Sequence, residues 1–562
     1  MLLRAGRGRY TPIGRSILAE VATNPIPPGQ GSTASRAPKI APGGANRAGL
    51  VAAGVMLSRL SGLVRAQFFA HFLGNSAAAD AFQAGFRIPN ILQNLLGEGV
   101  LSASFIPVYS KLLGEGDEET ADMVAWGVGS LLSLAVAILV VLGIFGAPYL
   151  IDVIAPGFQA DKRELTIHIV RILFPCTGLL VMSSWCLGVL NSHHKFFVSY
   201  SAGVAMNAAM IAALIYYGPR RSQDGLTIML SWAAIIGAIL QIAVQVPQMM
   251  ALMRRYNVNW QRIASPLKSV FHNLTPVVAS KGAVNISAYV DTVLASLLPT
   301  GAVAALNYGQ IIYMLPISLF GFSVAASELP TMSRAAASPE QMASILRYRL
   351  DRGLKQIAFW VVPSAAAFII LGDVISAVIF QSGAFKHADA IYVWSVVAGS
   401  GVGLLAATMG RLYNSAFYAL WDTRTPLRYA LIRVALTVVL GYLFAIPLPH
   451  WIGIDQKWGV AGLTASAGIA GWVEFVLLRR GLNRRIGWTG LHTKFLMPLW
   501  AMAVTASAIA FWIKLHTAFL GARIGGLLVL GIFGCVYFGL AWWFEVSELQ
   551  PYLDRIRRRA KS

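Results

Sequence analysis

Two arginines lie near the middle of an apolar run that covers residues 48–74. Arg59 and Arg65 are six residues apart, and an ideal helix, which turns by about 100° per residue, places them about 120° apart in azimuth. Both side chains can therefore line a wide cavity, although they cannot share one narrow seam. Because a guanidinium held among apolar residues is costly unless an anion neutralises it, the pair predicts a binding site for a phosphate, diphosphate or carboxylate.

The next apolar run, residues 79–112, carries both acidic and basic side chains. Asp80 opens the run, where a carboxylate suits the positive end of a helix. Arg87 precedes Pro89, which removes a helix hydrogen bond and permits a kink, and Glu98 lies about 20° away from Arg87 on an ideal helix. Structural pairing of the two arginines of the first run with Asp80 and Glu98 is the alternative to an anion site.

The composition indicates which elements carry these charges. The chain has 562 residues, 56% hydrophobic and 12% charged, with a mean hydropathy of +0.63, whereas a soluble domain has about 25% charged residues. The apolar runs reach about 20 residues, the length a membrane-spanning helix needs, and alternating strands of a membrane barrel are absent from the sequence. We predict an all-α polytopic membrane protein with fourteen transmembrane helices, in the runs 48–74, 79–112, 123–154, 165–191, 197–218, 226–253, 271–298, 302–333, 355–381, 389–417, 427–448, 458–480, 495–515 and 523–544.

The charge distribution predicts the orientation. An even number of spans places both ends of the chain on one side, and most of the 45 Lys and Arg residues then fall in the tails and loops of that side. Since basic loops stay in the cytoplasm, both termini are predicted to be cytoplasmic, and the net charge of +21 reflects topology rather than nucleic-acid binding. Residues 1–46, rich in Gly, Pro, Ser and Arg, are predicted to be a disordered basic cytoplasmic tail.

Common catalytic motifs are missing from the sequence. It contains no GxxxxGK[ST] phosphate loop, no HExxH zinc motif and no GxSxG nucleophile turn. The three cysteines all fall inside apolar runs and suggest no disulfide framework. We therefore expect no enzyme of these classes, no metal site and no bound cofactor, which leaves transport, scaffolding or an intramembrane enzyme.

Residues 58–110 hold a specific set of motifs, S-R-x-x-G-x-x-R, then D-A-F, then R-x-P-N followed by E-G, and S-x-x-F-x-P. This segment resembles the MurJ/MviN family of lipid II flippases. Further matches follow in the order of the family: APGF at 155–158, GVLNSHHKF at 188–196, LPISLFGFSVAASELPTMS at 315–333 and FYALWDTRTP at 417–426. The resemblance covers the chain from about residue 48 to beyond residue 480.

The resemblance implies a fold of the multidrug/oligosaccharidyl-lipid/polysaccharide exporter superfamily. Two six-helix lobes would form a V around a central cavity. The first lobe would comprise residues 47–255. The second, residues 256–482, would include a cytoplasmic amphipathic linker between spans six and seven. Residues 483–562 would add spans thirteen and fourteen and a basic tail.

The resemblance also implies a function. The protein would be a flippase, not an enzyme, that moves lipid II from the cytoplasmic to the periplasmic leaflet by alternating access for cell-wall synthesis. It would lie in the bacterial cytoplasmic (inner) membrane, with lipid II, membrane lipids and cell-wall synthesis proteins as partners, and no nucleic acid. The alternatives are a flippase for another polyprenyl-linked saccharide and a non-transporting membrane scaffold for cell-wall enzymes.

The resemblance assigns roles to individual residues, and the chain departs from the family at two of them. Many members have an arginine where this chain has Gln93, and another where it has Ile311. We expect Lys281 on span seven to compensate in part by facing the same cavity, the alternative being a lysine that extends to the membrane surface. The predicted substrate-binding residues are Arg59, Arg65, Asp80, Arg87, Glu98 and Lys281.

Ion coupling is a further expectation from the resemblance. Some relatives bind sodium near an acid of span seven, which makes Asp291 and Asp422 the candidate ion site. A structural hydrogen bond is the alternative for either carboxylate. The membrane potential offers a second source of coupling, worth about 2.3 kcal/mol per charge per 100 mV.

Overall fold

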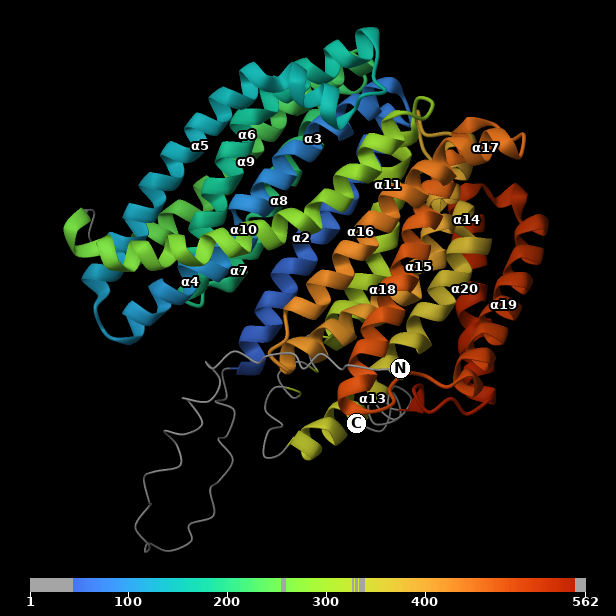
Figure 1. Ribbon diagram of the computed structural model, residues 1–562. Coiled ribbons are helices and arrows are strands. Elements are labelled where there is room, and N and C mark those ends of the chain that lie inside the picture. Colours follow the sequence, from blue (N-terminus) through green and yellow to red (C-terminus); the bar gives the residue numbers. More distant parts are fainter. Residues whose placement is uncertain (1–43, 254–258, 326–327, 329–331, 333–338, 551–562) are drawn as a thin grey trace, which may run out of the picture. The chain divides into compact units, whose positions relative to one another are not determined.

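The computed structural model describes residues 44–253, 259–325, 328, 332 and 339–550 (Figure 1). The predicted N-terminal tail lies outside this part of the chain except for residues 44–46, which begin a helix, and the end of the C-terminal tail also lies outside it. Two compact units are distinguished, Met1–Gly49 and Leu50–Ser562. Apart from the first residues of helix α2, the elements below belong to the second unit.

Helices make up the first half of the described chain. The predicted linker between spans six and seven is not separate from span seven. Its described residues continue into one 37-residue helix, α10. The helices are α2 (Gly44–Leu73), α3 (Ala77–Leu96), α4 (Glu98–Gly114), α5 (Glu118–Ile154), α6 (Ala160–Ser192), α7 (Phe196–Ser201), α8 (Gly203–Tyr217), α9 (Gln223–Leu252) and α10 (Trp260–Ser296).

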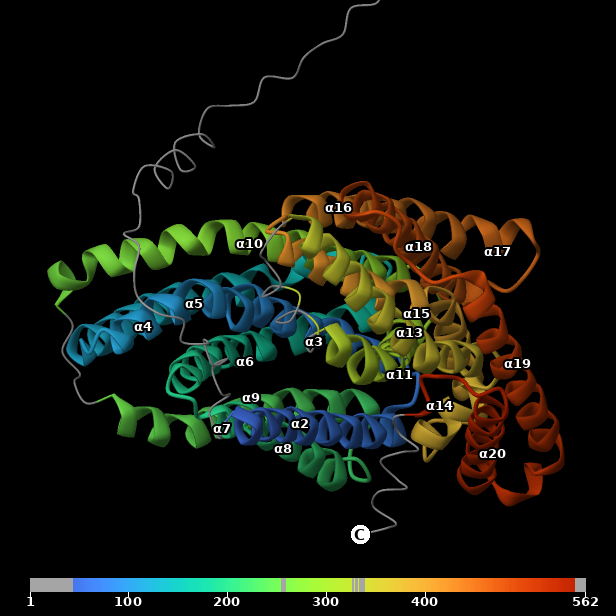
Figure 2. The same ribbon diagram turned by 90° about the horizontal axis from the view of Figure 1, so that it is seen from below.

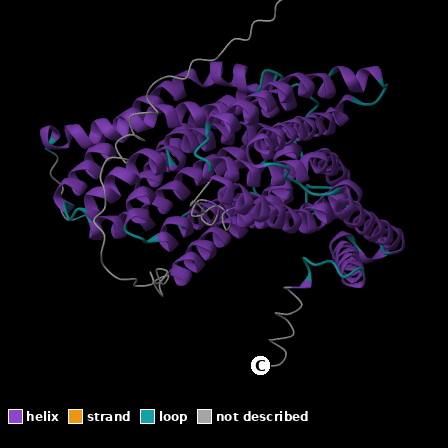
Figure 3. Ribbon diagram, turned by 60° about the horizontal axis from the view of Figure 1, so that its bottom comes forward, coloured by secondary structure: helices purple, strands orange, loops and turns teal. Residues whose placement is uncertain are grey.

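The second half is also helical, and no strand occurs in the part of the chain that the structure describes (Figure 3). Its elements are α11 (Ala302–Pro316), the π-helix η2 (Ile317–Phe322), α13 (Pro339–Ile370), α14 (Gly372–Phe380), α15 (His387–Ala419), α16 (Arg424–Ala445), α17 (Pro447–Trp451), η3 (Gln456–Trp458), α18 (Gly459–Ile486), α19 (Thr493–His516), η4 (Ala518–Leu520) and α20 (Ala522–Trp543).

The all-helical, membrane-spanning fold class is confirmed. Among the described residues, 11 helical segments are long and apolar enough to cross a membrane. The three predicted spans outside this set correspond to α2, to α3 with α4, and to α10. The count of fourteen stays a prediction.

One predicted span is two helices. The run 79–112 breaks at Gly97, whose backbone angles (φ −96°, ψ −115°) leave the helical region while its N–H still donates to the carbonyl of Gln93. A side chain at Gly97 would lie 2.6 Å from the hydroxyl of Ser184 on α6. The close approach of α6 therefore requires glycine at the junction, and the chain changes direction there.

The helices of the first half pack around α6, which contacts α3, α4, α5 and α9, while α8 packs against α9. In the second half α15 packs against α11, α13, α14 and α18, and α16 packs against α18. Helix α10 contacts α4 and α5 as well as α16, so it joins the two groups (Figure 1). The predicted lobe boundary at residue 255 stays a prediction.

The last two long helices form a separate pair. Helix α19 packs against α20 and α13, and α20 packs against α14, beside the second group of helices (Figure 2). Large apolar side chains on this pair remain exposed, among them Trp512, Leu527 and Trp543. Exposed apolar surface of this extent is expected where lipid rather than water surrounds the helices.

Close packing of α15 on α18 generates the first prediction. A Cβ at Gly403 of α15 would lie 2.3 Å from the Cα of Gly468 on α18, and small residues allow membrane helices to approach this closely. We expect Gly403→Val to force the helices apart and to lower the free energy of unfolding by about 1–3 kcal/mol. The measurement is the midpoint of thermal unfolding in detergent.

The matched control for this prediction is Gly534→Val on α20, where no atom lies within 4 Å of an added Cβ. Its midpoint should equal that of the unmodified protein. Equal midpoints for the two variants would contradict the packing argument.

Candidate anion-binding site

A polar cavity of about 310 Å3 lies among helices α2, α3, α6, α7, α8 and α9. Arg59 and Arg65 both line it, as their azimuths allow, so the structure brings these two predicted cations into one cavity. Its volume is at the lower end for ligand pockets, about 300–1,000 Å3. The other polar residues of the lining are Ser58, Asn90, Gln93, Ser183, Ser184, Ser199, Tyr200 and Gln241.

Helix α2 presents both arginines because α8 fixes its position. The side-chain amide of Asn207 on α8 donates to the hydroxyl of Ser61 at 2.8 Å and lies 3.4 Å from the backbone carbonyl of Ser58. Both acceptors belong to the stretch of α2 that carries the arginines. In an apolar environment such interhelical hydrogen bonds hold helices in register. Asn207 therefore positions the cationic wall of the cavity.

The arginines have neutral neighbours. The guanidinium of Arg65 lies 3.4 Å from the sulfur of Met210 and 5.5 Å from the centre of the Phe86 ring. Arg59 donates to the hydroxyl of Ser318 in η2 at 2.5 Å. Neither takes part in any ion pair found among the described residues, and none of the described side chains that line the cavity is a carboxylate. The site can therefore accept an anion in bidentate geometry without first displacing an acid.

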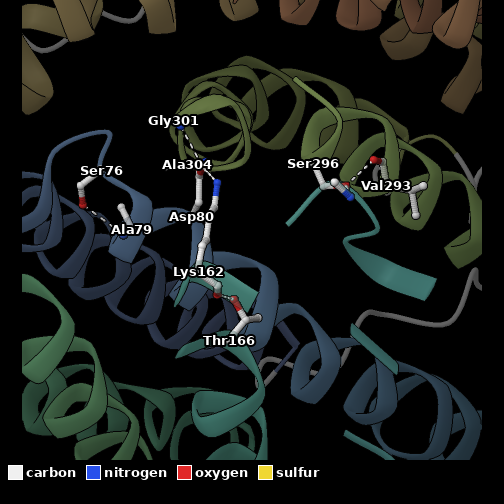
Figure 4. Close-up of polar contacts among 10 residues, drawn as sticks. Ser76, Ala79, Asp80, Lys162, Thr166, Val293, Ser296, Gly301 and Ala304 are labelled. Atoms are coloured by element: carbon white, nitrogen blue, oxygen red, sulfur yellow. Dashed lines mark hydrogen bonds and ion pairs between the residues drawn. The ribbon is translucent and has the colours of Figure 1, made fainter. Parts of the chain in front are cut away.

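Asp80 lies outside this cavity lining, in the first turn of α3, and its side chain is 1% exposed. Its carboxylate accepts hydrogen bonds from the ammonium of Lys162 at 2.6 Å and from the backbone N–H groups of Gly301 and Ala304 at 2.7 and 2.8 Å (Figure 4). These N–H groups begin α11, where an anion is favoured. The alternative that Asp80 pairs with the arginines of α2 is therefore wrong, because Lys162 and α11 satisfy it.

Further contacts surround Asp80 between the same two regions. The hydroxyl of Tyr308 donates to the carbonyl of Gly74 at 2.9 Å, and the N–H of Ala384 donates to the carbonyl of His71 at 2.7 Å. Gly301 has a positive φ of 96°, and an added Cβ would lie 2.7 Å from the carbonyl oxygen of Asn75. We call the bonds made by Asp80, Tyr308 and Ala384 the closing contacts, because they join α11 and the residues after α14 to α2 and α3.

Arg87 and Asp291 belong to a different charged cluster. They interact electrostatically across α3 and α10, and Asp291 also interacts with Arg433 of α16. Arg433 in turn lies 3.3 Å from the carboxylate of Glu474. A cation beside Asp291 would have to share that carboxylate with two guanidiniums.

Asp422 lies in the turn before α16 and is fully engaged. It accepts hydrogen bonds from the backbone N–H groups of Arg424 and Thr425, from the hydroxyl of Thr425 and from Arg485 at 2.5 Å. Burial raises its pKa, but the hydrogen bonds from Thr425 and Arg485 outweigh burial and lower the pKa to about 2. The group therefore stays ionised at neutral pH. No cluster of three or more His, Cys, Asp or Glu suited to a metal occurs in the described ranges.

The remaining predicted site residues divide into two kinds. Glu98 begins α4 and Lys281 lies on α10, but their side chains are outside the part of the structure that is described. Of the two positions where the family has cations, Gln93 faces the cavity, whereas Ile311 packs against the apolar core. An amide thus replaces one cation inside the cavity.

Several site residues escaped the sequence analysis. Gln241 lines the cavity from α9, Ser183 lines it from α6, and Lys162 neutralises Asp80. The glutamines inside this apolar run were a usable signal for Gln241, because a polar group there needs a partner. Lys162 carried no such signal, since it lies in the first turn of its helix and falls in a loop in the sequence-based prediction.

Comparisons with known proteins agree on one family. The sequence profile of the family described as lipid II flippase MurJ matches residues 69–532. The "Lipid II flippase MurJ" of Burkholderia cenocepacia is 29% identical over 528 residues, covering 90% of this chain and 97% of that protein. The "Probable lipid II flippase MurJ" of Rhizobium tropici is 30% identical over 521 residues, covering 90% of this chain and 94% of that protein.

Solved structures show the same fold. A structure described as lipid II flippase MurJ in an inward closed conformation matches with a TM-score of 0.71 at 22% identity, covering 88% of this chain and 98% of that chain. An inward-facing multidrug resistance MATE family transporter of the MOP superfamily matches with a TM-score of 0.62 at 16% identity, covering 78% and 98%. The predicted superfamily fold is thereby confirmed.

The geometry predicts unequal losses of stability when the two kinds of charge are removed. Lys162→Met leaves Asp80 buried without its cation, and we expect a loss of about 3 kcal/mol in the free energy of unfolding. Arg65→Met abandons no described carboxylate, so its loss should stay within about 1 kcal/mol. Thermal unfolding in detergent measures both. A larger loss for Arg65→Met than for Lys162→Met would show that Arg65 is a structural ion-pair partner.

Proposed function

The chain belongs to the MurJ family of lipid II flippases, and on that premise we propose that it carries lipid II, the undecaprenyl-pyrophosphate-linked precursor of peptidoglycan, from the cytoplasmic to the periplasmic leaflet of the bacterial inner membrane. The observation that carries the proposal is the cavity that Arg59 and Arg65 line together, with no carboxylate among the described side chains of its lining. A diphosphate is the anion of this substrate, and two guanidiniums suit its geometry.

The cavity suits one part of the substrate, the polar headgroup. The polyprenyl chain stays in the lipid, while the polar headgroup leaves water and enters the polar lining. Arg59 and Arg65 offset the free energy that the diphosphate loses with its hydration, because the positive guanidiniums and the negative diphosphate neutralise one another away from water. The cavity volume of about 310 Å3 suits one part of the headgroup rather than the whole.

The closing contacts support a mechanism of alternating access. They join the two groups of helices at the end of α2 and the start of α3. Under the predicted orientation, with both termini cytoplasmic, that end is periplasmic. Rocking of the helix groups toward the opposite opening would then break the bonds from Asp80 to the N-terminus of α11. Asp80 would act in gating rather than by touching the substrate.

Coupling by the membrane potential fits the charges better than a sodium site does. Asp291 and Asp422 both have arginine neighbours, which weakens either as a cation ligand. A net positive cavity moves with the electric field when the helices rearrange, at about 2.3 kcal/mol per charge per 100 mV. Cell-wall synthesis proteins remain proposed partners that would receive the exported precursor.

Rescue of a bacterial strain depleted of its lipid II flippase tests the function. The unmodified protein should restore growth, whereas Arg59→Ala and Arg65→Ala should reduce plating efficiency by about a hundredfold or more. Without its cationic partner, the diphosphate loses its hydration in the cavity at a high free-energy cost. Arg220→Ala is the control, since the described contacts of this exposed arginine side chain are with Tyr216. Full rescue by both cavity variants would rule out this function for the site.

Spin-label distances test the gating role of Asp80. Labels at the exposed positions Ala77 and Thr300 flank the closing contacts, in a background where the exposed Cys535 is replaced by serine. Asp80→Asn should shift the distance distribution toward longer values, because the amide loses the charge that binds Lys162 and α11.

The control for this measurement is Asp161→Asn, which removes an exposed acid beside Lys162 and should leave the distribution unchanged. An unchanged distribution for Asp80→Asn would show that Asp80 does not hold the two regions together.

A further inference from the structure

A chain of hydrogen bonds between α6 and α9 contributes to the lining of the cavity. The side-chain amide of Gln241 donates to the hydroxyl of Ser183 at 2.8 Å, and that hydroxyl donates to the side-chain carbonyl of Gln245 at 2.8 Å. All three side chains are buried. We call Gln241, Ser183 and Gln245 the amide ladder.

The amide ladder is not fully satisfied within the protein. The side-chain NH2 group of Gln245 is buried and has no hydrogen-bond partner among the described residues. A buried donor without an acceptor destabilises a fold, and in a membrane there is no surrounding water to replace the acceptor. Two glutamines placed in an apolar helix at this cost indicate a function, and Gln241 and Ser183 reach the cavity surface.

The cavity lining therefore combines two chemically different kinds of group. Helix α2 supplies two guanidiniums, whereas α3, α6 and α9 supply amides and hydroxyls, including Asn90, Gln93 and Gln241. Amides and hydroxyls both donate and accept hydrogen bonds, as the hydroxyl and acetamido groups of a sugar do. They offer little to a further negative charge. The charged groups suit the diphosphate, and the neutral hydrogen-bonding groups suit an adjoining saccharide.

We propose that the amide ladder recognises the saccharide of the lipid-linked substrate, with Gln241 as its contact residue and Ser183 and Gln245 as positioning residues. This inference rests on the proposed function, since it concerns the same cavity. It adds a determinant of specificity: a polyprenyl diphosphate that lacks the sugar engages the arginines but leaves the ladder without a ligand.

A purely structural role for the ladder makes a different prediction. If the glutamines only hold α6 against α9, their loss loosens the cavity and weakens every ligand alike. If the ladder recognises the sugar, removing its amide weakens the binding of the ligand that carries the sugar and leaves the binding of the ligand without sugar unchanged. A site built to form hydrogen bonds with a ligand group discriminates strongly against the analogue that lacks that group.

Binding to two lipids separates these roles. The full-length protein in nanodiscs is titrated with lipid II and with undecaprenyl pyrophosphate, which share the lipid and the diphosphate. The unmodified protein should bind lipid II at least about tenfold more tightly. Gln241→Leu, which keeps the side-chain size and removes the amide, should weaken lipid II binding about tenfold and leave undecaprenyl pyrophosphate binding within about twofold.

Two variants serve as references. Arg65→Ala should weaken both lipids by about tenfold or more, because both carry the diphosphate. Asn207→Leu removes another buried interhelical amide that lies outside the cavity lining, so any effect it has should be equal for the two lipids. Gln245→Leu should follow the pattern of Gln241→Leu with a smaller magnitude.

The outcomes are distinguishable. Equal weakening of both lipids by Gln241→Leu, or equal affinity of the unmodified protein for both, overturns saccharide recognition while the flippase function stands. Failure of the unmodified protein to bind either lipid, with no effect of Arg65→Ala, overturns the proposed function and this inference together.

Discussion

The cost of holding a charge away from water governs this protein, and the structure meets it in two opposite ways. Asp80 is buried, yet one ammonium and two backbone N–H groups at a helix N-terminus neutralise it. Arg59 and Arg65 have no acid among the described ion pairs and face a polar cavity instead. The first arrangement stabilises a conformation, and the second leaves a place for an anion.

The same cost bears on the helices that carry the predicted site residues. Most of these residues lie on α2, α3, α4 and α10, and each charged group lowers the free-energy gain of moving such a helix into lipid. Helices α4 and α10 pack against α5, which exposes large apolar side chains such as Phe145. Contacts within the protein can therefore hold the charge-bearing helices while an apolar neighbour faces the lipid.

Sequence alone was enough for the fold class and for the cationic pair. Run length and composition predict spanning helices, and the spacing of Arg59 and Arg65 allows both to face one cavity. The break at Gly97 could not be predicted, because it depends on the approach of Ser184 from another helix. The partner of Asp80 was equally hidden, since Lys162 is 82 residues away in sequence and the N–H donors of Gly301 and Ala304 depend on how α11 packs. Tertiary contacts, which local pattern does not encode, decide both.

Two helices connect the closing contacts to the cavity. Helix α3 carries Asp80 in its first turn and Gln93 in the cavity lining, about 20 Å apart along a helix that rises about 1.5 Å per residue. Helix α6 carries Lys162 in its first turn and Ser183 in the lining, about 30 Å apart by the same rise. A ligand shifts a conformational equilibrium only by its differential affinity for the two states. An anion that draws α2 toward α3 and α6 in the cavity therefore acts on the same two helices whose first turns form the ion pair of Asp80 with Lys162. The physical route from substrate binding to opening is then the tilt of these helices, and it requires no chemical step.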